Sequence, residues 1–292
     1  MKANYWVRLG IMTVVSLLVM FAVTLVWFSY QQTQNYLHPT RQAVSEGLLN
    51  AQGMYPQHVT LTTEDNVKLA AWYTPPQNGA VILVAHGYGD RRSEEYFLLF
   101  AQKGYGVLAW DFRAHGQSEG DFSSLGYYEV IDTKAALDFA LSQPGVEHIG
   151  AWGGSMGAVT MVRATAQYPQ IEALVADSPF AALEDEMNLR VTLPPMRPLI
   201  RFFAERAIDV GFDRVRPVDE IGKISPRPIF LIQGLADSMV PLDSAQRLFD
   251  AASEPRQLWL EEGVGHLGMY GTYEEKYTRQ VIGFFDRYLL GK

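Results

Sequence analysis

The sequence predicts an α/β protein with a mostly parallel sheet and helices on both of its faces. Residues 80–85 form a continuous apolar run, which is typical of a strand that is buried on both sides. From there to residue 290, strand-like runs alternate with helix-like patterns, and this alternation favours right-handed crossovers between parallel strands. The chain has 292 residues, 48% of them hydrophobic, so it can bury a large core.

A long apolar segment precedes the predicted sheet. Residues 9–28 are 20 consecutive residues without a charge, and at about 1.5 Å per helical residue they would cross roughly 30 Å, the thickness of a bilayer core. The alternatives are a cleaved signal peptide and a buried helix of a soluble protein. A signal peptide has an apolar region of about 7–15 residues that ends in small residues, whereas this run ends in the aromatic sequence WFSY at 27–30. We therefore expect residues 1–30 to form an uncleaved transmembrane anchor.

Few charges flank this segment. Lys2 and Arg8 precede it, and the next basic residue is Arg41. The positive-inside rule then predicts a single-pass cell-membrane protein with a cytoplasmic N-terminus and an extracytoplasmic domain. Residues 31–54 are polar and are expected to form a stalk.

The folded domain is expected to cover residues 55–292 and to begin with a hairpin. Residues 58–62 and 67–73 each alternate with period two around a polar turn, which predicts an antiparallel edge on the sheet. The strands expected after 80–85 are 106–110, 146–152, 171–176, 228–232 and 257–260, and the helices are 130–141, 158–168, 242–252 and 274–290.

One stretch breaks the alternation. Residues 180–223 have helical patches on both sides of Pro194-Pro195 and no strand pattern. Such an insertion lies over the carboxyl edge of the sheet, where ligands bind in open α/β folds. We therefore expect a helical cap.

Composition excludes several classes of function. The formal charge is 24 − 32 = −8, so no basic surface indicates a nucleic-acid partner. Cysteine is absent, which excludes disulfide scaffolds, thiolate zinc sites and cysteine nucleophiles. No zinc-protease motif, carboxylate cage or dinucleotide fingerprint occurs, so we expect neither a metal nor a cofactor. The oligomeric state is not predicted.

Residues 153–157 read GGSMG and match the pattern G-x-S-x-G, with Ser155 at its centre. The motif follows a predicted strand and precedes a predicted helix, which is the setting of a nucleophile elbow. A serine on so tight a turn has strained dihedral angles, and glycines on either side let neighbouring backbone pass close by. The alternative is a glycine-rich helix start with a capping serine.

A base and an acid are needed to activate a serine hydroxyl. Of the six histidines, only His266 follows Ser155 in the chain, in a glycine loop after the last strand. The candidate acid is Asp237, in the loop after the preceding strand, and its competitor is Asp177, which closes the strand 171–176. The predicted triad is therefore Ser155, Asp237 and His266.

At these residues the chain resembles the α/β-hydrolases, specifically membrane-anchored bacterial serine hydrolases of the serine aminopeptidase-like and monoacylglycerol-lipase-like group. The resemblance covers about residues 57–290 and includes HGYGD at 86–90 and DFRAHGQS at 111–118. It implies the α/β-hydrolase fold and an oxyanion hole formed by the backbone N–H groups of Tyr88 and Met156.

The block 111–118 is expected to shape a loop beneath the site, with Arg113 in an ion pair. The family usually has glycine where Ala114 stands, so the backbone of this loop could differ slightly.

Together these residues predict a serine hydrolase that cleaves carboxylic esters through an acyl-enzyme. Apolar side chains of the cap could line an acyl pocket or touch the bilayer, which makes small-molecule or lipid esters the expected substrates. An exopeptidase is the main alternative, in which the acidic residues 184–186 would hold a peptide amine. A non-catalytic, membrane-tethered binding module is a third reading, and it fits poorly with the joint presence of nucleophile, acid and base.

Overall fold

The computed structural model describes residues 2–292, with side chains from residue 4 onward, so Met1 of the expected anchor lies outside the described residues. Eight strands form one sheet in the order β1-β2-β4-β3-β5-β6-β7-β8. Strands β1 and β2 form an antiparallel hairpin, and β2 also pairs antiparallel with β4. All remaining strand pairs are parallel. The expected mostly parallel sheet with an antiparallel N-terminal hairpin is confirmed. The strands are β1 Gln57–Thr62, β2 Lys68–Thr74, β3 Ala80–Ala85, β4 Gly106–Trp110, β5 His148–Gly154, β6 Ala173–Asp177, β7 Ile229–Gly234 and β8 Arg256–Glu261.

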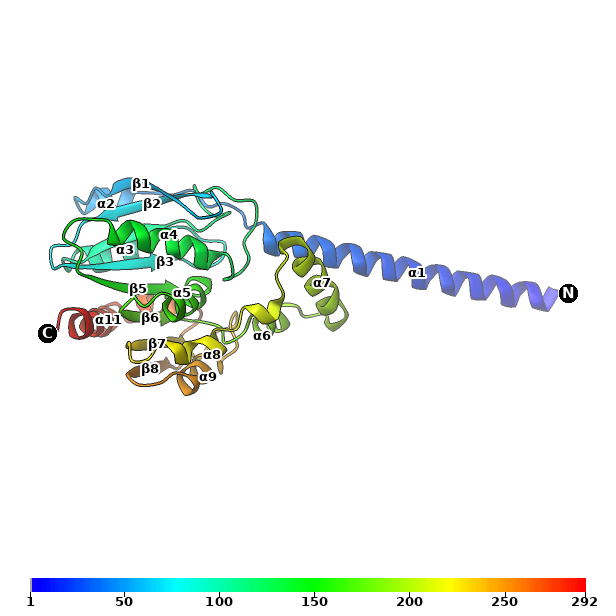
Figure 1. Cartoon of the computed structure of the whole chain (residues 1–292). Helices are drawn as coiled ribbons and strands as arrows, with labels where there is room; N and C mark the ends of the chain where they lie inside the picture. The colour runs from blue at the N-terminus through cyan, green and yellow to red at the C-terminus, as the bar shows by residue number, and fades with distance from the viewer. Residues whose placement is uncertain (1) are drawn as a thin grey trace.

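Helices cover both faces of this sheet (Figure 1). On one face, Leu137 of α4 and Val159 of α5 belong to the same buried cluster as residues of the cap. On the other face, Phe97 of α3 and Phe285 of α11 belong to a second buried cluster. The helices outside the cap and the N-terminal segment are α3 Glu94–Ala101, α4 Glu129–Leu141, α5 Met156–Gln167, α9 Ser244–Ala251, α10 Gly268–Thr272 and α11 Glu274–Leu289.

The expected cap lies between β6 and β7, and residues 178–228, all of them described, contain helices and turns but no strand. The prolines at 194 and 195 begin a short 3-10 helix that separates its two main helices, α6 and α7. Figure 1 shows α6 and α7 at the end of the sheet from which the N-terminal helix projects. The cap elements are α6 Leu183–Arg190, η1 Pro194–Met196, α7 Arg197–Ile208, η2 Phe212–Arg214, α8 Pro217–Glu220 and η3 Ile221–Ile224.

The N-terminal helix α1 runs without interruption from Lys2 to Leu37. Within residues 2–292 it is the one helix that is long and apolar enough to cross a membrane, and most of its apolar side chains are exposed. The segment 31–54 is not a free stalk in this structure. Ser29, Thr33 and Leu37 are buried at intervals of four residues, so they form one stripe along the helix that packs on the domain.

Residues beyond α1 also join the domain. Leu49, in the short helix α2 (Gly47–Ala51), is fully buried. Arg41 donates to the carbonyl oxygen of Gly120 at 2.9 Å, and the Gln42 side chain donates to that of Gly89 at 3.0 Å. The chain between the expected anchor and β1 is therefore part of the body that surrounds the predicted site.

Candidate functional site

Ser155 occupies the sharp turn between β5 and α5. Its φ of 53° and ψ of −119° are strained for an L-residue, as the motif predicts. A Cβ on Gly153 would lie 2.4 Å from the carbonyl oxygen of Gly157, and one on Gly157 would lie 2.3 Å from that of Ala85, so neither position has room for a side chain. The amide of Ser155 donates to the carbonyl oxygen of Asp177 at 2.8 Å, which ties the turn to the end of β6.

The structure brings the three residues of the predicted triad together. The Ser155 hydroxyl donates to Nε2 of His266, with 2.9 Å between the two atoms. Nδ1 of His266 lies 2.7 Å from Oδ2 of Asp237. The other oxygen of Asp237 accepts from the amides of Met239 and Val240 at 2.8 and 3.0 Å, so the carboxylate is held in one orientation. This chain of hydrogen bonds can draw a proton from the serine hydroxyl.

Asp177, the competing acid, has other partners. Its carboxylate accepts from the hydroxyls of Tyr277 at 2.8 Å and Ser178 at 2.9 Å, and complete burial raises its pKa to about 6. Ser178 in turn accepts from the amide of Leu267 at 3.3 Å, next to His266. Asp177 therefore supports the loop that carries the histidine and does not contact the imidazole.

The two backbone amides expected to form the oxyanion hole belong to segments that adjoin the serine. Met156 begins α5 directly after Ser155, and the segment 87–88 passes so close that a Cβ on Gly87 would lie 3.3 Å from the Cβ of Ser155. Within residues 2–292 neither the Tyr88 amide nor the Met156 amide has a hydrogen-bond acceptor. Two free donors next to a nucleophile suit the developing negative charge of an oxyanion.

Two histidines that the sequence left without a role hold the loop that carries Tyr88. The imidazole of His86 accepts from the Phe112 amide at 3.0 Å, and that of His115 accepts from the Gly89 amide at 3.0 Å. The other nitrogen of each ring lies within 2.8 Å of a backbone carbonyl oxygen, so both rings are neutral. Burial lowers the pKa of both histidines to about 4. The loops after β3 and β4 are thereby fastened together.

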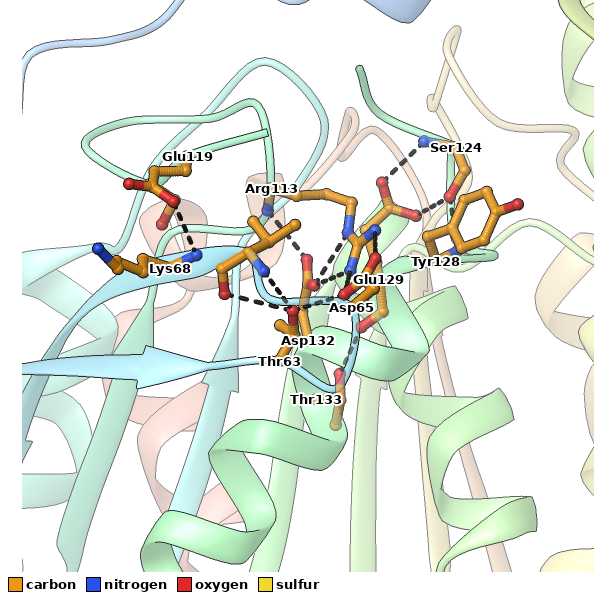
Figure 2. Close-up of polar contacts among 12 residues, drawn as sticks. Thr63, Asp65, Lys68, Arg113, Glu119, Ser124, Tyr128, Glu129, Asp132 and Thr133 are labelled. Carbon is orange, nitrogen blue, oxygen red and sulfur yellow. Dashed lines mark hydrogen bonds and ion pairs between the residues drawn. The ribbon is translucent and has the colours of Figure 1, made fainter. Parts of the chain in front are cut away.

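A buried ionic network fixes the loop after β4 from the other side (Figure 2). Arg113 contacts Oδ1 of Asp132 at 2.7 Å and Oδ2 of Asp65 at 2.8 Å, which confirms the expected ion pair. Ala114, the next residue, keeps the left-handed conformation that favours glycine, with φ of 61°.

Glu129 is a fully buried carboxylate beside this network. It accepts from the Ser124 hydroxyl at 2.5 Å and from the Gly126 amide at 2.9 Å. Burial raises its pKa, but these hydrogen bonds outweigh that effect and hold the pKa below its usual value. Glu129 thus orders the turn that presents Leu125, a residue of the cavity beside the serine.

The cavity beside Ser155 is narrow, with about 10 Å³ of space for water, roughly one molecule. Its walls come from three parts of the chain: Tyr36 from α1, Tyr88 from the loop after β3, and cap residues that include Glu186 and Met187. A second cavity of about 270 Å³ lies between α6 and α7. Met187 lines both cavities.

Sequence reasoning missed the contribution of α1 to this site. The Tyr88 hydroxyl donates to the carbonyl oxygen of Asn35 at 2.8 Å, and Tyr36 forms part of the cavity wall. The available signal was the spacing of Ser29, Thr33 and Leu37, a stripe that marks a packed helix face. In the described residues, no group of three or more His, Asp or Glu side chains is arranged to hold a metal ion.

Several known proteins are similar to this chain. The family model described as "Serine aminopeptidase, S33" matches residues 76–210, a range that includes Tyr88 and Ser155 and ends before Asp237. The Bacillus subtilis (strain 168) protein YqkD is 30% identical over 223 residues, 73% of each chain. Alpha/beta hydrolase domain-containing protein 17B of Xenopus laevis is 27% identical over 209 residues, 69% of this chain and 66% of that one. The esterase Pf2001 of Pyrococcus furiosus is 26% identical, with a TM-score of 0.72 over 86% of this chain and 99% of the esterase.

Proposed function

Because this chain belongs to the α/β-hydrolase superfamily, we propose that it is a serine hydrolase, anchored in the cell membrane by residues 9–28, that cleaves carboxylic esters. The observation that carries the proposal is the unbroken hydrogen-bonded chain from Asp237 through His266 to the Ser155 hydroxyl. The similarity to an esterase over most of both chains supports an ester as the substrate.

In the proposed reaction, Ser155 attacks the ester carbonyl while Nε2 of His266 takes up its proton. Asp237 stabilises the imidazolium that forms, and the proton then passes to the leaving alcohol. The amides of Tyr88 and Met156 stabilise the oxyanion, and removing one such donor typically lowers the rate about 10²–10³-fold. Water, activated by His266, then hydrolyses the acyl-enzyme and regenerates the serine.

The cap supports an acyl ester as the substrate. The cavity between α6 and α7 lies beyond Met187, and Val191, Ile200 and Phe212 are among its buried apolar walls. An acyl chain bound to Ser155 would reach this cavity if the flexible Met187 side chain moved aside. The variant Met187→Trp should therefore lower kcat/KM for long-chain esters much more than for acetyl esters, and an equal loss for both would contradict this path.

An exopeptidase remains the second candidate, because the matching family model is described as a serine aminopeptidase. Such an enzyme needs a carboxylate that is free to bind the substrate amine. Each acidic residue of 184–186 pairs instead with an arginine, and the partners are Arg201, Arg247 and Arg190. These pairs favour the ester hydrolase.

Labelling with a fluorophosphonate probe tests the nucleophile. The wild-type chain and a Ser142→Ala control should be labelled, and Ser155→Ala should not; labelling of Ser155→Ala would refute the assignment. A panel of acyl esters and aminoacyl amides, matched in leaving group, then ranks the two enzyme candidates. Faster turnover of the aminoacyl amides would favour the exopeptidase.

We also propose that the N-terminus is cytoplasmic and the hydrolase domain extracytoplasmic, as the positions of Lys2 and Arg8 suggest. Because the chain has no cysteine, single cysteines can report this topology. A membrane-impermeant maleimide added to intact cells should label Gly291→Cys and leave Asn4→Cys unlabelled. The opposite pattern would reverse the orientation.

A further inference from the structure

The cap helix α7 packs against α1 at the level where the proposed membrane span ends. The rings of Tyr30 and Phe203 are 5.5 Å apart, and the hydroxyl of Thr33 donates to the carbonyl oxygen of Ile200 at 3.4 Å. Tyr30 follows Phe28 by two residues, about 3 Å along the helix axis. The interfacial layer on each side of a bilayer core is about 5–8 Å thick, so this contact falls inside that layer.

Exposed apolar side chains gather on the same part of the cap. Phe202 is 60% exposed and Leu193 is 57% exposed, while Trp27 and Phe28 on the neighbouring helix are each 53% exposed. Large apolar side chains that lie together on a surface mark a contact with a partner or a membrane. Their continuity with the apolar surface of α1 favours the membrane.

The charge of α7 points to the same partner. Arg201 of this helix is paired with Glu184 and Glu205, whereas Arg206 is exposed and forms no ion pair within residues 2–292. Arg206 lies four residues after Phe202 and therefore shares its helix face. Helices that combine aromatic and basic residues bind the bilayer interface, where the basic groups meet lipid phosphates.

We propose that Leu193, Phe202 and Arg206, which we call the cap face, dock on the lipid bilayer beside α1, and that the substrate is an ester of an acyl amphiphile resident in that membrane. This inference rests on the proposed anchor and esterase activity. Tyr36, in the wall of the cavity beside Ser155, is six residues beyond Tyr30, about 9 Å along the axis. The ester group of such a molecule can therefore approach the serine while part of its tail stays in the bilayer.

A depth measurement tests the docking. The full chain, reconstituted at one copy per lipid nanodisc, carries a nitroxide label on Phe202→Cys or on the control Leu141→Cys, an exposed residue at the far end of α4. The label at 202 should show high collision rates with oxygen and low rates with a water-soluble nickel chelate. The control label should show the reverse.

Other results would overturn the proposal. A label at 202 that is as accessible to the nickel chelate as the control shows that the cap face stays in water. Shielding that appears only in discs with two copies shows that a second chain covers it. A chain that fails to enter the discs refutes the anchor itself, and the docking with it.

An activity measurement separates docking from catalysis. Phe202→Asp should lower hydrolysis of a long-chain monoacyl ester in nanodiscs about tenfold and leave hydrolysis of a water-soluble short-chain ester within twofold of the wild type. Phe202→Trp should keep both activities. Equal rates of the wild type and Phe202→Asp on the membrane ester would refute the proposed role of the cap face. The esterase proposal is tested separately by Ser155→Ala, which should lose both activities; a Ser155→Ala variant that keeps them would refute the esterase and not the docking.

Discussion

Replacing Asp237 by asparagine gives a sharp test of the proposed acid. Oδ1 of Asp237 accepts two backbone amides, and Oδ2 faces Nδ1 of His266. In Asp237→Asn the carbonyl oxygen would stay with the two amides, because they need an acceptor, and the NH₂ group would face the imidazole. His266 would then carry its proton on Nε2 and could no longer accept one from Ser155.

The size of the effect follows from the contact distance. At the 2.7 Å between Nδ1 and Oδ2, an imidazolium beside a carboxylate gains roughly 6 kcal/mol at an effective dielectric constant of about 20. Each 1.36 kcal/mol is tenfold in rate, so the neutral amide should lower kcat/KM about 10⁴-fold. The value is measured on a water-soluble short-chain ester and normalised to folded protein by circular dichroism.

The matched control is Asp177→Asn, the same chemical change at the other buried carboxylate. Since Asp177 bonds to Tyr277 and Ser178 and not to His266, its replacement should lower kcat/KM of the folded protein less than tenfold. If this variant does not fold, Tyr277→Phe removes one of the same hydrogen bonds. A loss below tenfold in Asp237→Asn, or a larger loss in Asp177→Asn, would refute the reasoning.

Three further predictions concern stability. Ala114→Gly should raise the free energy of unfolding by about 0.5–1 kcal/mol, because it relieves a left-handed alanine at some entropic cost, and a lower value in urea unfolding would contradict this. Gly157→Ala should strongly lower the free energy of unfolding, since its Cβ would lie 2.3 Å from the carbonyl oxygen of Ala85 at the end of β3. Gly283→Ala, whose Cβ would meet open space, should instead stabilise α11. Equal changes in the free energy of unfolding for the two variants would contradict this packing. The pKa values of His86 and His115 are near 4 in the folded protein and about 6.5 in the unfolded chain. Between about pH 6.5 and 4 the unfolded chain therefore binds more protons than the folded protein, so the contribution of the two histidines to stability is lost as the pH falls through this range. Their NMR ring signals should accordingly not titrate between pH 8 and 5.

Much of the fold was predictable because its signals are local. The strands from β3 to β8 appear as short apolar runs between helical patterns. The turn at Ser155 is a motif whose glycines are required by close contacts within the same turn and with the adjacent strand. His266 could be chosen by its position after the last strand. Met156 and Tyr88 came from family resemblance, and their role as oxyanion donors stays a prediction.

Other features depend on contacts between distant parts of the chain, and no local pattern predicts them. The neutral state of His115 follows from the Gly89 amide, 26 residues away, and the burial of Glu129 follows from a turn that folds back over it. The helix α3 was not predicted, although Ser93 caps it by accepting from the Tyr96 amide. The polar composition of 31–54 suggested a stalk because composition does not show that a few apolar residues among polar ones are buried.

The uninterrupted helix from Lys2 to Leu37 joins the proposed membrane anchor directly to the hydrolase domain. With residues 9–28 placed in the membrane as proposed, this continuous helix would hold the domain, and the opening next to Ser155, in one orientation relative to the bilayer. A version shortened to begin at residue 55 would lack Tyr36, one wall of the cavity beside Ser155, and Asn35, whose carbonyl oxygen accepts from the Tyr88 hydroxyl. A truncation that removes only residues before Ser29 would keep these contacts.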